Sequence, residues 1–339
     1  MIFNLKRVFN NHKIANKKLL NISNKINVKE INKIEYKTIF NKEKIINLSH
    51  IQAPDYYQDI EDSKYLKITN GLKVIGIVSI IRKKIFFNLL TIVRINDGPM
   101  IVKGSFEAKN KILKLVLKFI KENYSIFISL APPYIYDEKK LFESINFINL
   151  KNPANNTYTI DLLKSEKYLF NNLKSNWRNG LKKGLKYVSI REVDNLEITL
   201  QILKEYENYA NQLGFKPISF QKSVKWFKNY IENNGLLNLK IYNAYILKNP
   251  ENNLGSIGVL CFKNKALYLF GYTNVLGRKY QANVAMLWYS ILNSKENGFT
   301  EFDLGGFNAK TSKGIKKFKE GLNGNIRKTL GEYIYIGIF

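Results

Sequence analysis

The stretch Phe302–Gly324, FDLGGFNAKTSKGIKKFKEGLNG, decides how the rest of the chain is interpreted. The apolar run 302–304 predicts a strand, and the pair Gly305-Gly306 predicts a tight turn directly after it. A polar loop follows, and then a short basic helix is predicted around Lys319. A strand end, backbone amides and a lysine held together in this way suit an anionic group or a developing oxyanion.

The predicted basic helix has two faces. Ile315, Phe318 and Leu322 recur at helical spacing, so we expect them to face the core. The lysines take the remaining directions: Lys313, Lys316, Lys317 and Lys319. Two interpretations stay open, a solvated lysine face on an ordinary amphipathic helix and a site that uses one of these cations.

Composition limits the class of protein. A chain of 339 residues fits two domains, and 45% apolar residues with 21 Tyr and 21 Phe can bury a large core. The net charge of +27 suits a polyanion or an anionic membrane surface. The chain is rich in Lys, Asn and Ile, with only seven arginines among 54 basic residues, so compositional drift also explains part of the charge. Both explanations stay open.

Several function classes are not expected. Cys261 is the only cysteine and lies in a strand-like run, which predicts a buried thiol and no disulfide. His12 and His50 lie in polar surroundings without a supporting motif, so neither a metal site nor a histidine-dependent nucleophile is predicted. Because no membrane span or secretory signal is recognisable, we expect a cytoplasmic protein. Peripheral contact with an anionic membrane is compatible with Phe3 and its lysine-rich surroundings, and a frayed terminal arm is the alternative.

The first part of the chain predicts a strand-rich unit with one helix. Asn70-Gly71 predicts a hairpin, and Pro54 predicts the start of a short helix. The predicted strands are 34–39, 65–69, 73–81, 86–94, 100–102 and 126–130, and the predicted helix is 106–123.

The second part predicts strands and helices in mixed order. The predicted strands are 157–162, 188–193, 240–247, 255–262, 266–272, 302–304 and 333–339. The predicted helices are 169–187, 196–213, 220–233 and 281–295, besides the basic helix.

The helix predicted at 169–187 carries two stripes four residues apart. The apolar stripe is Leu173, Trp177, Leu181 and Leu185. The basic ridge is Arg178, Lys182 and Lys186. The ridge is either a solvated face or a surface that binds phosphate.

Both halves run strands, helix, strand. We therefore predict an α+β fold with a first domain at 1–150 and a second at 151–327, in which a C-terminal strand at about 328–339 returns to the first domain.

Four stretches resemble the FemA/FemB/FemX superfamily of non-ribosomal peptidyltransferases, which have tandem GNAT-like domains. The stretches are 96–99 (NDGP), 176–183 (NWRNGLKK), 302–306 (FDLGG) and 314–324 (GIKKFKEGLNG). The resemblance covers about 55–337, and its last two motifs in tandem are the specific part. Leu322-Asn323 departs from the family's Phe-Gly, and the early Lys/Trp pattern of some members is not recognisable.

The resemblance implies two GNAT-like domains, each with a mixed, mostly antiparallel sheet flanked by helices. It implies transfer of an amino acid from aminoacyl-tRNA to an amine of a peptidoglycan precursor, lipid-linked or nucleotide-linked. The implied partners are therefore tRNA and the precursor, with no tightly bound cofactor and no metal. Since 194–234 is interrupted, no long coiled-coil arm is expected.

The resemblance and the residues together nominate a site. Lys319 is expected to stabilise charge, and Asp303 to accept a proton or to stabilise the turn. Arg178 is expected to hold a phosphate or to form a surface ion pair. The full set of expected substrate-binding residues is Phe318, Arg178, Trp177, Tyr272, Gly305, Gly306 and Lys316.

Two rival functions stay open. One is an acyl-CoA-dependent N-acyltransferase acting on an amino sugar in envelope glycan synthesis. The segment 278–285 stands where its pyrophosphate loop would be expected, but it lacks the glycines. The other is a non-catalytic protein that binds RNA or a membrane.

Overall fold

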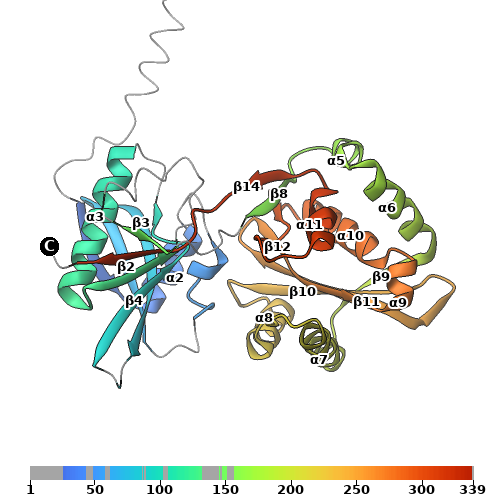
Figure 1. Ribbon diagram of the computed structural model, residues 1–339, viewed down its shortest axis with the longest axis horizontal. Helices are drawn as coiled ribbons and strands as arrows, with labels where there is room; N and C mark the ends of the chain where they lie inside the picture. The colour runs from blue at the N-terminus through green and yellow to red at the C-terminus, as the bar shows by residue number, and fades with distance from the viewer. Residues whose placement is uncertain are drawn as a thin grey trace, which may run out of the picture. The chain divides into compact units, whose positions relative to one another are not determined.

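The computed structural model describes residues 26–42, 49–57, 62–85, 87, 89–101, 106–131, 145, 147–150 and 156–337. The chain forms two compact units (Figure 1). The first comprises Met1–Ala154 and Thr329–Phe339, and the second Asn155–Lys328. Both are mixed α+β, as the fold class predicted. None of the helices in the described ranges combines the length and apolar character needed to cross a membrane.

The described residues of the first unit form one mixed sheet. Its strands follow the order β1-β2-β3-β4-β6-β15-β7, with β5 paired to β3. All pairs are antiparallel except β4 and β6. The elements are β1 (Ile26–Ile31), α2 (Lys33–Lys42), η1 (His50–Gln52), β2 (Ser63–Asn70), β3 (Lys73–Ile85), β4 (Leu90–Asn96), β5 (Met100–Ile101), α3 (Phe106–Asn123), β6 (Phe127–Ala131), β7 (Ile148–Asn149) and β15 (Tyr333–Ile336).

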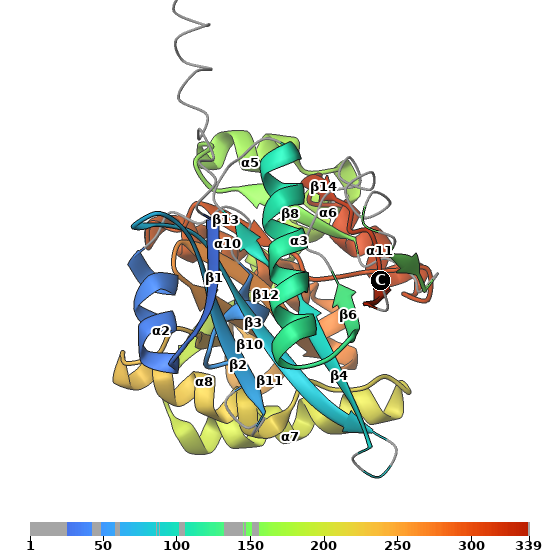
Figure 2. The same ribbon diagram turned by 90° about the vertical axis from the view of Figure 1, so that its left-hand side faces the viewer.

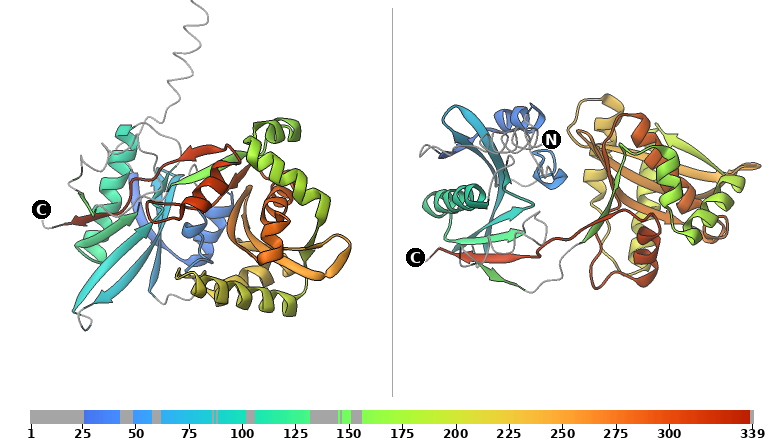
Figure 3. Two further views of the ribbon diagram at one scale, coloured as in Figure 1. Left: turned by 45° about the vertical axis from the view of Figure 1, so that its right-hand side comes forward. Right: turned by 90° about the horizontal axis from the view of Figure 1, so that it is seen from above.

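Helices cover both faces of this sheet (Figures 2 and 3). Leu66 of β2 lies in the core that the apolar side of α3 shares with the strands. Its neighbour Tyr65 points to the opposite face, as adjacent strand residues must, and contacts Tyr36 of α2. The hairpin predicted at Asn70-Gly71 is confirmed, and Gly71 has the positive φ of 58° that this turn requires.

Two predictions in the first unit were wrong. Residues 34–39 lie in the helix α2, because Tyr36, Ile39 and Phe40 share a buried helical face and Asn32 caps the first turn. No helix begins at Pro54. The helical turn precedes it at His50–Gln52, where the Ser49 side chain accepts a hydrogen bond from the Ile51 amide.

The second unit holds a seven-stranded sheet in the order β14-β8-β13-β12-β11-β10-β9, in which only β12 and β13 are parallel. Helices α5, α6 and α10 cover one face, and α7 and α8 the other (Figure 1). The elements are β8 (Thr157–Asp161), α5 (Glu166–Asn172), α6 (Ser175–Tyr187), β9 (Val188–Val193), α7 (Leu196–Gln212), α8 (Phe220–Glu232), β10 (Asn238–Ile246), β11 (Asn249–Phe262), β12 (Lys265–Thr273), α9 (Val275–Lys279), α10 (Ala282–Glu296), β13 (Glu301–Asp303), α11 (Lys313–Glu320) and β14 (Asn325–Arg327).

The helix predicted at 169–187 is two helices, α5 and α6, and its stripe is only partly buried. Leu173 is buried at the end of α5, but Leu185 is 54% exposed. Gly184 takes the buried place on α6, because a repeat of four drifts off a helical face that turns every 3.6 residues. Gly184 lies against Ala285 of α10, so the two helices pack closely there.

The predicted absence of a long arm is confirmed in the described residues. The helices α7 and α8 are short and pack against each other, and α8 contacts β10. The thiol of Cys261 is buried as predicted, and burial raises its pKa to about 12.

Candidate active site

The candidate site is built on the turn that follows β13. This strand is held between β12 and β8, so its end has a defined position. Gly305 has φ of 75°, and a Cβ there would lie 2.7 Å from the backbone oxygen of Tyr268. Only glycine fits this close, left-handed turn without strain.

Lys319 reaches this turn from α11. Its ammonium donates hydrogen bonds to the backbone oxygens of Gly305 (2.8 Å) and Gly306 (2.9 Å). The residue is only 6% exposed, so of the two interpretations left open by the sequence, a solvated face does not apply to Lys319. Burial lowers the pKa of Lys319 to about 8, and the nearby Asp303 carboxylate opposes that shift.

Asp303 closes the same turn from the strand side. One of its carboxylate oxygens accepts a hydrogen bond from the Gly305 amide (2.8 Å) and another from the Thr157 hydroxyl. Burial raises the pKa of Asp303, while these hydrogen bonds and the Arg327 guanidinium act against the rise. The carboxylate therefore stabilises the backbone on which Lys319 depends.

A chain of charges continues from Asp303 along the sheet. Arg327 of β14 lies 4.0 Å from Asp303 and 2.7 Å from Glu301. Lys265 lies 3.1 Å from the other oxygen of Glu301. Thr157, Arg327 and Lys265 were not predicted from the sequence, because their positions beside Asp303 and Glu301 depend on which strands pair. The only sequence signal was the scarcity of arginine, which makes Arg327 conspicuous.

The helix α11 is held against α6 by Trp177. The indole N–H donates to the backbone oxygen of Phe318 (3.1 Å), and the two rings are 6.1 Å apart. A Cβ on Gly321 would lie 2.2 Å from the indole ring. Trp177 is buried, so the structure gives it a packing role under the helix that carries Lys319. The Phe318 side chain, which contacts the indole ring, is half-buried.

The remaining nominated residues do not join this cluster. Arg178 donates to the backbone oxygen of Leu173 at the end of α5, and no hydrogen bond or ion pair in the described chain links it to Lys319. Lys316 is half-buried on α11. The Ile315 side chain was predicted to face the core, but it is 47% exposed.

Tyr272 lies elsewhere on the sheet. It is five residues beyond Leu267, the strand neighbour of Asp303, and hence roughly 16 Å further along β12. Its hydroxyl donates to Glu205 of α7 (2.7 Å), and burial together with that carboxylate raises its pKa.

The segment 278–285, where the pyrophosphate loop of an acyl-CoA enzyme would be expected, contains the end of one helix and the start of another. The helix α9 ends inside this segment at Lys279, and Gln281, with a φ of 60°, is the N-cap of α10. Gly180 and Gly184 of α6 lie against Gln281 and Ala285, so α6 packs on the first turn of α10. This packing does not favour an open phosphate site at that helix end.

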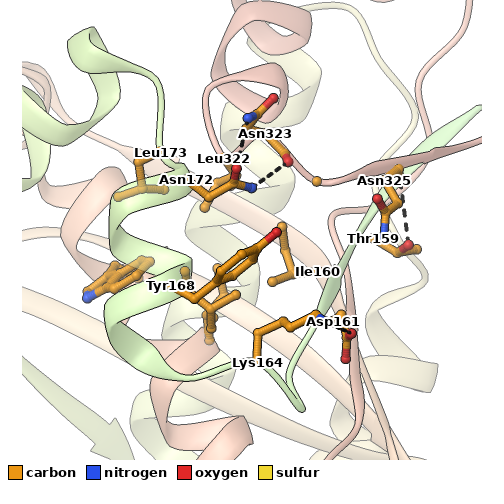
Figure 4. A pocket seen from close by; sticks show the side chains of 14 residues that line it. Thr159, Ile160, Asp161, Lys164, Tyr168, Asn172, Leu173, Leu322, Asn323 and Asn325 are labelled. Carbon is orange, nitrogen blue, oxygen red and sulfur yellow. Dashed lines mark hydrogen bonds and ion pairs between the residues drawn. The ribbon is translucent and has the colours of Figure 1, made fainter.

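A separate pocket of about 310 Å³ opens between β8, α5 and α10 (Figure 4). Its apolar lining residues include Leu169, Ile291 and Leu322. On its rim, Asn172 and Asn323 are joined by hydrogen bonds of 3.0 and 3.1 Å. Neither Lys319 nor Asp303 lines it. The volume is at the lower end for small-molecule sites.

Comparisons with known proteins agree with this architecture. The FemAB family model matches residues 163–336. The crystal structure of FemX aligns with a TM-score of 0.73 at 14% identity, covering 91% of this chain and 97% of that chain. L-PGS from Bacillus licheniformis aligns with a TM-score of 0.55 at 12% identity, covering 92% and 94%.

A tandem GNAT protein from the clavulanic acid biosynthesis pathway aligns with a TM-score of 0.52 at 8% identity, covering 92% of this chain and 99% of that chain. At these identities the structural matches show the fold, which is the tandem GNAT-like fold predicted from the sequence. No curated protein matches the sequence.

Proposed function

Since this chain belongs to the FemAB family, we propose that it is an N-acyltransferase that moves an amino acid from aminoacyl-tRNA to an amine of a peptidoglycan precursor. The observation that carries the proposal is the buried ammonium of Lys319 on the glycine turn after β13. It places a cation and a rigid backbone turn together in a largely dry environment, where electrostatic stabilisation is strongest.

For this reaction the protein must mainly position the two reactants and stabilise the negative charge that develops on oxygen. The acceptor amine attacks the ester carbonyl carbon, and a tetrahedral intermediate carries the negative charge on oxygen. The C–N bond forms, the C–O bond to the tRNA ribose breaks, and the proton lost by the amine ends on the ribose oxygen. Because the ester is already activated, holding the two reactants in place supplies much of the rate.

In this proposal Lys319 stabilises the developing oxyanion. Two of its three N–H groups are held by Gly305 and Gly306, so the ammonium is fixed and its third N–H remains for the reacting oxygen. Asp303 acts as a positioning residue, because its hydrogen bonds go to the turn and to Thr157. Proton acceptance by Asp303 is not required.

The basic surface supports a nucleic-acid donor. On α6, Lys182, Lys183 and Lys186 are exposed, and the chain carries a net charge of +27. Such a surface attracts a phosphate backbone without reading its sequence. We therefore propose tRNA and a lipid-linked or nucleotide-linked muropeptide as the two substrates.

The test is transfer of a labelled amino acid from charged tRNA to these muropeptides by the purified protein. We expect transfer by the wild type and a loss of about 10²–10³ in rate for Lys319→Met. Lys317→Met removes an exposed lysine from the same helix and serves as the matched control. No transfer to any acceptor with any charged tRNA, or equal rates for the two variants, would refute the proposal.

A further inference from the structure

The β3–β4 hairpin of the first unit extends beyond its sheet. The ladder between β2 and β3 ends at Ser63 and Ile81, and β6 begins to pair with β4 only at Ile92. Within the described residues, the strand ladder beyond these points joins only β3 and β4, out to Ile85 opposite Leu90, and the Arg82 amide still donates a hydrogen bond to the backbone oxygen of Asp62 (2.9 Å). Figure 2 shows the hairpin continuing past the ends of the neighbouring strands.

The end of this hairpin exposes large apolar side chains. Phe87 is 100% exposed and Leu89 is 86% exposed. An isolated exposed apolar residue is ordinary. Two of them at a protruding tip form an apolar surface, and moving that surface from water into an apolar phase lowers the free energy.

The same tip is basic and carries no acid. Residues 82–91 have the sequence RKKIFFNLLT. Arg82 pairs with Asp62 (3.3 Å), whereas Lys83 and Lys84 are exposed and form no ion pair within the described residues. Two lysines therefore stand directly behind the apolar end.

Further groups of the same kind lie at this end of the sheet. Ile126 and Ile336 flank the β6–β15 pair and are 38% and 36% exposed. The nearby carboxylate of Glu122 lies 3.8 Å from Lys118, so its charge is already matched. The end of the unit thus combines apolar side chains with an excess of cations.

We propose that the hairpin tip, formed by Lys83, Lys84, Ile85, Phe87, Leu89 and Leu90, inserts into the surface of an anionic lipid bilayer. Apolar side chains would enter the headgroup boundary while the lysines behind them meet anionic lipids. A convex tip offers little area for a stable protein interface, and a second copy would bring like charges together. This inference goes beyond the proposed function and does not depend on it.

The test is co-sedimentation of the full chain with vesicles of phosphatidylglycerol and phosphatidylcholine, and with vesicles of phosphatidylcholine alone. We expect binding to the anionic vesicles that falls at least about ten-fold in the double variant Phe87→Ser/Leu89→Ser. Lys83→Gln and Lys84→Gln should each weaken binding about five-fold at low salt.

The other end of β3 supplies a matched control. Leu72, in the β2–β3 turn, is 104% exposed, so Leu72→Ser removes an equally exposed apolar group and should leave binding unchanged. The three native tryptophans are all buried, so Phe87→Trp adds an exposed reporter whose emission should shift to the blue with anionic vesicles. Unchanged binding of the double variant, an equal loss in Leu72→Ser, or no shift would overturn the proposal. Loss of self-association in the double variant without a change in vesicle binding would also overturn it.

Discussion

The buried ammonium of Lys319 should make the stability of the second unit depend on pH in a specific way. Its pKa is lowered by burial from 10.5 to about 8. Between these values the unfolded chain binds the proton and the folded chain does not, so stability rises with pH across this window. Lys319→Met removes the titrating group, and the difference in stability between wild type and variant isolates its contribution.

The magnitude follows from the two pKa values. Near pH 7, Lys319 is protonated in both the folded and the unfolded wild-type chain, so almost none of the pH-dependent increase in the free energy of unfolding has yet appeared. Between pH 7 and pH 10, the lowered pKa of Lys319 should raise the wild-type free energy of unfolding by about 2.5 kcal/mol. The destabilisation caused by Lys319→Met should therefore be smallest near neutral pH and grow steadily towards pH 10.

The assay is urea unfolding followed by tryptophan emission at several pH values. All three tryptophans, Trp177, Trp226 and Trp288, lie in the second unit, so the signal reports on the unit that contains Lys319. Lys317→Met is the control and should track the wild type at every pH. A wild-type advantage over Lys319→Met that stays constant from pH 7 to pH 10 would refute the assignment of a buried, proton-releasing lysine.

Three further outcomes are expected. Gly305→Ala places a Cβ against a backbone oxygen at positive φ and should cost at least ~2 kcal/mol of unfolding free energy in urea melts, whereas Gly298→Ala, at φ 78° in open space, should cost about 1 kcal/mol. Gly321→Ala meets an indole carbon at 2.2 Å and should lower both the melting temperature and transfer, while Gly314→Ala, with nothing within 4 Å, should lower neither. Acetyl-CoA should not raise the melting temperature, and a saturable rise would revive the acyl-CoA reaction.

Local patterns were enough to predict most strands and helices of the second unit. The bounds of β9 (Val188–Val193) are as predicted: a valine stands at each end, and Asp194-Asn195 follows as a turn signal. The turn after β13 was also predictable, since two adjacent glycines after an apolar run leave few alternatives. What periodicity alone left open was which lysine of α11 is buried.

The choice among these lysines depends on tertiary contacts. Lys319 is buried because the helix begins at Lys313 and packs on Trp177, which turns position 319 towards the glycine pair. Likewise, Arg327 and Thr157 reach Asp303 only because β14 and β13 both pair with β8. The pairing and register of these strands cannot be predicted from the sequence of a single strand.

The path of the chain between the units has a consequence for biosynthesis. The last strand, β15, lies between β6 and β7 in the first unit's sheet, although the whole second unit separates it from them in sequence. A ribosome must therefore finish the second unit before the first can close its sheet. We expect the second unit to become protease-resistant earlier during translation, and a chain that stops after Lys328 to leave β6 with an open edge prone to aggregation.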